Sequence, residues 1–202
     1  MINMMALGDS IFAGWDGQKQ IEDYRRIPEV IAKLNGWYVN NQAIGGSGYG
    51  NGMNDFPAIT ARLDFRNYSL ALLNYGVNNW MFGSSADEIE NGLTDGINNI
   101  RKSNPQIKIY VVCPTLDMRK GNMTNLNTPN ERGLTQNQLN NIIIKVCQKL
   151  SVDYYDWRKQ PIITKDNAWY TLGDGTTGVH PTANTSLEIG KRLAYELNGG
   201  RR

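Results

Sequence analysis

The sequence predicts an α/β fold in which a parallel sheet is covered by helices on both faces. Short apolar runs alternate along the chain with segments of helical periodicity, and each run ends near Gly, Pro, Asn or Asp, as strands do. Such alternation is typical of parallel sheets buried on both sides. The 202 residues suffice for one domain with a full hydrophobic core, and no linker or repeat divides them. We therefore expect a single domain over residues 1–202.

Five strands and four main helices follow from these patterns. The expected strands are Met4–Leu7, Trp37–Ala43, Leu70–Tyr75, Ile107–Cys113 and Val152–Trp157. The expected helices are Pro28–Leu34, Glu88–Ile100, Gln136–Leu150 and Asn184–Leu197. Two of these helices are preceded by capping-box patterns, Ser85 with Glu88 and Thr135 with Gln138. Residues 115–134 are rich in Asn, Thr and Gly, which predicts a surface loop near the site.

Composition narrows the class of partner. Hydrophobic residues make up 40% and charged residues 20% of the chain, and the net charge is +2 with no long run of one sign, so neither a nucleic-acid nor an anionic-membrane partner is expected. No apolar stretch approaches the ~20 residues that span a bilayer, and the N-terminus lacks signal-peptide features. The chain is expected either to act in the cytoplasm or to be a domain cut from a secreted or virion protein. Cys113 and Cys147 lie in apolar runs and are expected to be buried free thiols. The sequence does not indicate an oligomeric state.

A nucleophile and a base are suggested by two loop residues. His180 is the single histidine of the chain and lies in a loop just before the last expected helix, so it is the candidate proton carrier at neutral pH. Ser10 follows the first expected strand directly, in Gly8-Asp9-Ser10. A serine hydroxyl attacks a carbonyl only when a base removes its proton, so Ser10 needs an imidazole nearby. Taken alone, Gly-Asp-Ser is also ordinary turn chemistry.

Acyl transfer also needs hydrogen-bond donors for the developing oxyanion. Gly46 follows the second expected strand and offers a backbone N–H, while Asn78 follows the third and offers an amide side chain. Ser10, Gly46 and Asn78 thus all fall just beyond the carboxyl ends of strands, where open α/β sheets bind ligands. The glycine-rich segment fits neither a dinucleotide-binding nor a P-loop pattern, and one histidine with two scattered cysteines makes a zinc site improbable.

In this order, these segments resemble the blocks of the SGNH/GDSL hydrolases, over nearly the whole chain. Gly8-Asp9-Ser10, Gly46, Gly76-Val77-Asn78-Asn79 and the stretch ending in His180-Pro181 are similar to four of the family's blocks. The resemblance implies a three-layer α/β/α sandwich with a flavodoxin-like parallel sheet of about five strands. It also implies Ser10 as nucleophile, His180 as base, and an oxyanion hole made by Ser10 N–H, Gly46 N–H and Asn78. No metal or cofactor is implied.

Two positions depart from the family pattern. Asn79 stands where the family has Asp in a supporting position, and Thr177 stands where it has the carboxylate of the triad. A triad carboxylate orients the imidazole and stabilises its charged form. Asp174 lies three residues upstream in a glycine-rich loop that can fold back, and we favour it as the replacement. The alternative is a dyad of Ser10 and His180, with a backbone carbonyl or Thr177 orienting the ring.

The resemblance leads us to expect an esterase that cleaves acyl esters of small molecules or carbohydrates. Acetyl esters are favoured, since no long apolar lid segment is evident. Trp15, Tyr49 and Trp80 lie close to the blocks in sequence and are expected to offer ring faces to a sugar, although core packing is the alternative for each. The Thr177 departure also leaves a second hypothesis open. In that case the domain is catalytically weak and serves as a carbohydrate-binding or structural module of a phage or surface protein.

Overall fold

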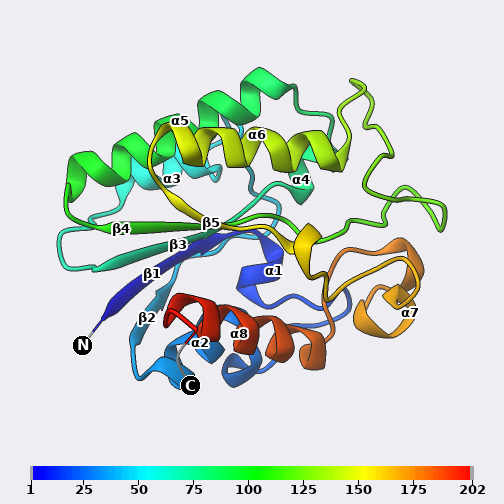
Figure 1. The fold of residues 1–202 in the computed structure, drawn as a ribbon, viewed down its shortest axis with the longest axis horizontal. Helices are drawn as coiled ribbons and strands as arrows, with labels where there is room; N and C mark the ends of the chain where they lie inside the picture. The colour runs from blue at the N-terminus through cyan, green and yellow to red at the C-terminus, as the bar shows by residue number, and fades with distance from the viewer. Residues whose placement is uncertain (1, 201–202) are drawn as a thin grey trace.

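The computed structural model describes residues 2–200 and shows a five-stranded, fully parallel sheet between two layers of helices (Figure 1). The strands lie in the order β2-β1-β3-β4-β5, which is the flavodoxin-like order. They are β1 (Asn3–Gly8), β2 (Tyr38–Asn41), β3 (Leu70–Asn74), β4 (Lys108–Val112) and β5 (Asp153–Tyr155). All five expected strands are confirmed, and so is the three-layer architecture.

Alternating side chains of the central strands form two separate cores. Met5 and Leu7 of β1 point to one face of the sheet, while Met4 and Ala6 point to the other. The first core is covered by α3 (Phe56–Arg62), α5 (Ala86–Ser103) and α6 (Gln136–Lys149). The second is covered by α2 (Ile27–Asn35) and α8 (Ala183–Leu197), with α1 (Ser10–Ala13) at the end of β1 (Figure 1). Because both faces are buried, the carboxyl edge of the sheet is where a site can open to solvent.

The four main helices begin and end close to their expected bounds. Ser85 and Glu88 form a capping box at the start of α5, and Thr135 and Gln138 form another at the start of α6. The sequence patterns did not predict α1, α3 and the two short helices α4 (Val77–Met81) and α7 (Ala168–Thr171). They also did not predict the 3₁₀ turns η1 (Asp23–Arg25), η2 (Trp157–Lys159) and η3 (Gly175–Thr177). These elements span at most two turns, too short for a clear apolar period.

Two smaller expectations are also resolved. Cys113 and Cys147 are both buried and free, as expected. Residues 115–134 contain no helix or strand, but the segment is only partly at the surface, because residues 115–118 are buried. Among residues 2–200, no helix combines the length and hydropathy that crossing a bilayer requires.

Candidate active site

Ser10 occupies the first position of α1, directly after β1. Asp9 caps this short helix by accepting a hydrogen bond from the Ile11 N–H at 3.0 Å, and Gly14 ends it in a left-handed conformation with φ of 85°. The Ser10 N–H has no acceptor within the helix because first-turn amides lack an i−4 carbonyl. Both the hydroxyl and the amide of Ser10 are therefore presented at the edge of the sheet.

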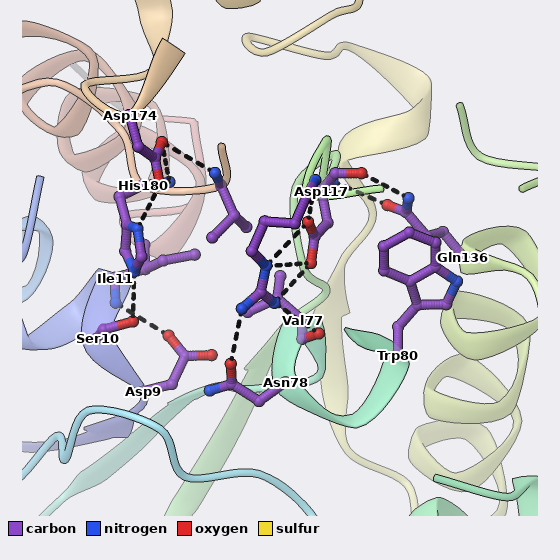
Figure 2. A network of polar contacts seen from close by, with 12 residues as sticks. Asp9, Ser10, Ile11, Val77, Asn78, Trp80, Asp117, Gln136, Asp174 and His180 are labelled. Carbon is purple, nitrogen blue, oxygen red and sulfur yellow. Dashed lines mark hydrogen bonds and ion pairs between the residues drawn. The ribbon is translucent and has the colours of Figure 1, made fainter. Parts of the chain in front are cut away.

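Ser10, His180 and Asp174 form one chain of hydrogen bonds (Figure 2). The distance from Ser10 Oγ to His180 Nε2 is 2.9 Å, and the distance from His180 Nδ1 to Asp174 Oδ2 is 2.6 Å. The other carboxylate oxygen, Asp174 Oδ1, accepts from the N–H groups of Val179 and His180 at 3.0 and 3.1 Å. Burial raises the pKa of Asp174, but these hydrogen bonds outweigh it and place the pKa below its ordinary value. Asp174 is accordingly ionised at neutral pH.

A closed loop brings Asp174 back to His180. The N–H of Gly173 donates to the carbonyl of His180 at 2.9 Å, and Leu172 and Pro181 form an antiparallel bridge. Inside this loop the 3₁₀ turn η3 begins at Gly175, which has φ of +76°. A side chain at Gly178 would displace the carboxylate, because a Cβ there would lie 1.8 Å from Asp174 Oδ1. Thr177, at the family's carboxylate position, is exposed at the end of the turn.

The expected oxyanion donors, Gly46 and Asn78, follow the ends of two other strands, β2 and β3. In the loop after β2, a Cβ built on Gly45 would lie 3.8 Å from Ser10 Cβ, and Gly46 follows with φ of +80°. Asn78 is buried in α4, directly after β3, and donates through Nδ2 to the Ser47 carbonyl at 2.9 Å. Each Nδ2 carries two hydrogens, so one N–H of Asn78 remains for another acceptor.

Asn79 and the three aromatic residues play different structural parts. Asn79 Oδ1 accepts from the Tyr49 N–H at 2.9 Å, which is an acceptor role that the family's Asp would also fill. The expectation that Tyr49 and Trp80 face a substrate is wrong, because both side chains are fully buried in the core, with 0% exposure. Trp15 is 39% exposed and keeps an accessible ring. Burial could not be read from the sequence, since all three residues stand beside the same blocks.

A buried ion pair that the sequence does not predict lies beside Asn78. Arg119 contacts Asp117 through Nε and Nη2, with the shortest distance 2.6 Å, and the Asp117 side chain is 1% exposed. Arg119 Nη1 lies 3.3 Å from Asn78 Oδ1, and Nη2 lies 2.9 Å from the carbonyl of Val77. An Asp-x-Arg sequence in a polar loop predicts a solvated turn, so only the fold shows that this pair is buried next to Asn78.

Comparisons with known proteins agree with this architecture. The sequence model of the GDSL-like Lipase/Acylhydrolase family matches residues 6–185. A comparison with curated proteins finds no match. Similar solved structures include a putative arylesterase from Agrobacterium tumefaciens str. C58, which is 20% identical with all of both chains covered and a TM-score of 0.76.

Two further structures show the same fold. A carbohydrate acetylesterase family member from Sinorhizobium meliloti is 17% identical over 99% of each chain, with a TM-score of 0.73. The inhibitor-bound aryl esterase of M. smegmatis is 18% identical over all of both chains, with a TM-score of 0.74. Structures with such low sequence identity support the fold alone, whereas the sequence model of the family covers nearly the whole domain. The chain therefore belongs to the GDSL-like lipase/acylhydrolase family and is a carboxylic-ester hydrolase.

Proposed function

We propose that this protein hydrolyses acetyl esters, including those of carbohydrates, with Ser10 as nucleophile, His180 as base and Asp174 as the orienting carboxylate. The observation that carries the proposal is the continuous chain of hydrogen bonds from Ser10 Oγ through His180 to Asp174. An ionised Asp174 accepts the hydrogen of His180 Nδ1, which leaves Nε2 as an acceptor for the Ser10 hydroxyl. This is the tautomer that a general base requires.

The reaction proceeds in two acyl transfers. Ser10 Oγ attacks the ester carbonyl carbon while His180 Nε2 takes the hydroxyl proton. The tetrahedral intermediate then expels the alcohol, which receives that proton from His180, and leaves an acyl group on Ser10. A water molecule attacks this acyl-enzyme with His180 again as base, and collapse releases the carboxylic acid and restores Ser10.

Three donors serve the oxyanion in both transfers. They are the N–H groups of Ser10 and Gly46 and the free N–H of Asn78 Nδ2. Their donation strengthens as charge develops on the carbonyl oxygen, so they stabilise the transition state more than the bound ester.

Two observations support the choice of substrate class. Proteins of the same fold include arylesterases and a carbohydrate acetylesterase, by their names. The exposed ring of Trp15, five residues after Ser10, suits stacking against a sugar. The competing hypothesis of a catalytically weak binding module depended on a missing carboxylate, and the contact between Asp174 and His180 removes that reason.

Turnover of p-nitrophenyl acetate and of an acetylated monosaccharide tests the proposal. We expect the wild type to release nitrophenol and acetate, and Ser10→Ala to abolish both reactions while its thermal unfolding stays close to wild type. Wild-type turnover by Ser10→Ala would refute the nucleophile assignment. Cleavage of the aryl ester without any cleavage of the sugar ester would refute the carbohydrate part alone.

A further inference from the structure

We propose that Arg119 is a positioning residue that fixes the side-chain amide of Asn78 in the orientation needed to bind the oxyanion. This inference rests on the proposed function, because it assigns a task within the same site. The guanidinium group of Arg119 reaches the beginning of α4 and donates to both Asn78 Oδ1 and the Val77 carbonyl. One guanidinium group thus holds both the side chain of Asn78 and the backbone carbonyl of the residue before it.

An amide side chain can be turned by 180° about its last torsion at little steric cost, and only its partners decide which end is nitrogen. The guanidinium of Arg119 has donors and no acceptor, so it can face only Oδ1 of Asn78. The carbonyl of Ser47 is an acceptor, so it can face only Nδ2, at 2.9 Å. A flipped amide would put donor against donor and acceptor against acceptor. The remaining N–H of Nδ2 is thereby aimed in one direction.

Arg119 is itself held rigidly. Nε and Nη2 make a two-point contact with the carboxylate of Asp117, and the Arg119 side chain is only 19% exposed. The backbone of Asp117 is fixed in turn by Gln136, which accepts from its N–H at 2.9 Å and donates to its carbonyl at 2.8 Å (Figure 2). Since Gln136 is the first residue of α6, the orientation of Asn78 is anchored to a main helix of the domain.

The charges of the pair suit a positioning role. A guanidinium beside the amide oxygen polarises Asn78 and makes Nδ2–H a better donor. Asp117 compensates the positive charge, so the pair does not form a free cationic site for an acidic substrate. Arg119 acts on the oxyanion through Asn78, and removing it should lower kcat rather than raise KM.

The chain supplies a matched control. Arg158 forms the same Asp-x-Arg arrangement with Asp156, with Nη2 to Oδ2 at 2.8 Å, and its side chain is 22% exposed. It also contacts α6, through Asn137 and Asn141. Arg158 therefore matches Arg119 in type, burial and local geometry, but none of its contacts involves Asn78.

A double-mutant cycle between Arg119 and Asn78 tests the inference. With p-nitrophenyl acetate, we expect Arg119→Ala to lower kcat roughly 10- to 100-fold with KM nearly unchanged, as for a misplaced catalytic group. Asn78→Ala should lower kcat roughly 10²- to 10³-fold. The double variant should be no slower than Asn78→Ala, because Arg119 has nothing left to orient. Arg158→Ala should keep wild-type kcat, and guanidinium ion in solution should restore part of the activity of Arg119→Ala.

Two outcomes would overturn the inference. One is that the losses of kcat in the two single variants multiply in the double variant, and the other is that Arg119→Ala changes KM alone. All rates are divided by the fraction of protein that a fluorophosphonate titrates, so that partial unfolding does not imitate a kcat effect. If Arg119→Ala fails to fold, Arg119→Lys replaces it, because one ammonium group cannot hold Asp117, Val77 and Asn78 together. Wild-type kcat in Arg119→Ala with an inactive Ser10→Ala would reject this inference and leave the proposed function standing.

Discussion

Asp9 is unusual among the carboxylates of this protein. It is 1% exposed, its Oδ1 caps α1, and its Oδ2 has no hydrogen-bond partner within the described residues. Burial raises the pKa of Asp9 to about 7, against the opposing effects of the hydrogen bond from the Ile11 N–H and of the nearby Arg119 guanidinium. Ionisation of Asp9 at higher pH therefore lowers the free energy of unfolding.

We predict that Asp9→Asn stabilises the protein at alkaline pH. In the unfolded chain Asp9 loses its proton near pH 3.8, while in the folded protein it keeps the proton until about pH 7. The folded state thus binds more protons between these values, and wild-type stability falls as pH rises through this window. Asn keeps the cap without ionising. The advantage of Asp9→Asn should be near zero at pH 4 and grow toward about 4 kcal/mol above pH 7, at 1.36 kcal/mol per pKa unit.

Urea unfolding at pH 4, 6 and 8 measures this difference. Asp64→Asn serves as the control, because the hydrogen bonds from Arg66 lower the pKa of the exposed Asp64 to about 2. Its effect on stability should be flat from pH 4 to pH 8. A stability difference between wild type and Asp9→Asn that is equally flat would show that Asp9 is already ionised at the low end of this range.

At the scale of elements, the loop from Leu172 to Pro181 decides whether the site is a triad or a dyad. Its ends are joined by the bridge of Leu172 with Pro181 and by the hydrogen bond from Gly173 N–H to His180 carbonyl. This closure places the Asp174 carboxylate against the outer nitrogen of the imidazole, at 2.6 Å. Thr177 is exposed, and the imidazole nitrogen that it would have to contact is already occupied by Asp174.

We predict that Asp174→Asn lowers kcat by several orders of magnitude, about 10⁴ by analogy with the loss of the carboxylate in a Ser-His-Asp triad. An amide at this position would also favour the wrong tautomer of His180. Thr177→Asp should gain almost nothing, because Nδ1 is already occupied. Steady-state rates with p-nitrophenyl acetate check both variants. A nearly silent Asp174→Asn together with a faster Thr177→Asp would establish the dyad.

The same loop shows where sequence reasoning ends. The positions of Ser10 and Asn78 followed from the sheet alone, since both stand just past strands whose carboxyl ends must meet at one edge. Asp174 was only favoured, because six residues of separation from His180 fix no geometry. Asp174 reaches His180 because backbone hydrogen bonds close the loop and because Gly178 has no side chain. Neither feature can be recognised from a local sequence pattern.

Long-range contacts were harder still to predict. Arg119 reaches Asn78 across 41 residues from a loop without periodicity, so no pattern linked them. The burial of Tyr49 and Trp80 depends on how α3, α4 and α5 pack, and α3 and α4 were themselves missed. For example, Gly92 of α5 comes so close to the Tyr49 carbonyl that a Cβ would lie 1.7 Å from it. The strands and main helices were predictable because their apolar periods are local, whereas these contacts are not.

At the scale of the whole molecule, the parallel sheet gathers groups from distant parts of the chain. Ser10, Asn78 and Arg119 follow β1, β3 and β4, while Asp174 and His180 lie between β5 and α8. Two hydrophobic cores pack against the two faces of the sheet. A site assembled in this way should react at one serine only, since Ser10 alone among the described serines contacts His180.

Covalent labelling with a fluorophosphonate, followed by intact-protein and peptide mass spectrometry, tests this central claim most directly. The reagent phosphonylates an activated serine and stays attached, so it reports the nucleophile without assuming a substrate. We predict a single adduct, located on the peptide that contains Ser10, absent in Ser10→Ala and formed far more slowly in Asp174→Asn. An adduct on another serine such as Ser47, or ester hydrolysis by a protein that never forms the Ser10 adduct, would contradict the account.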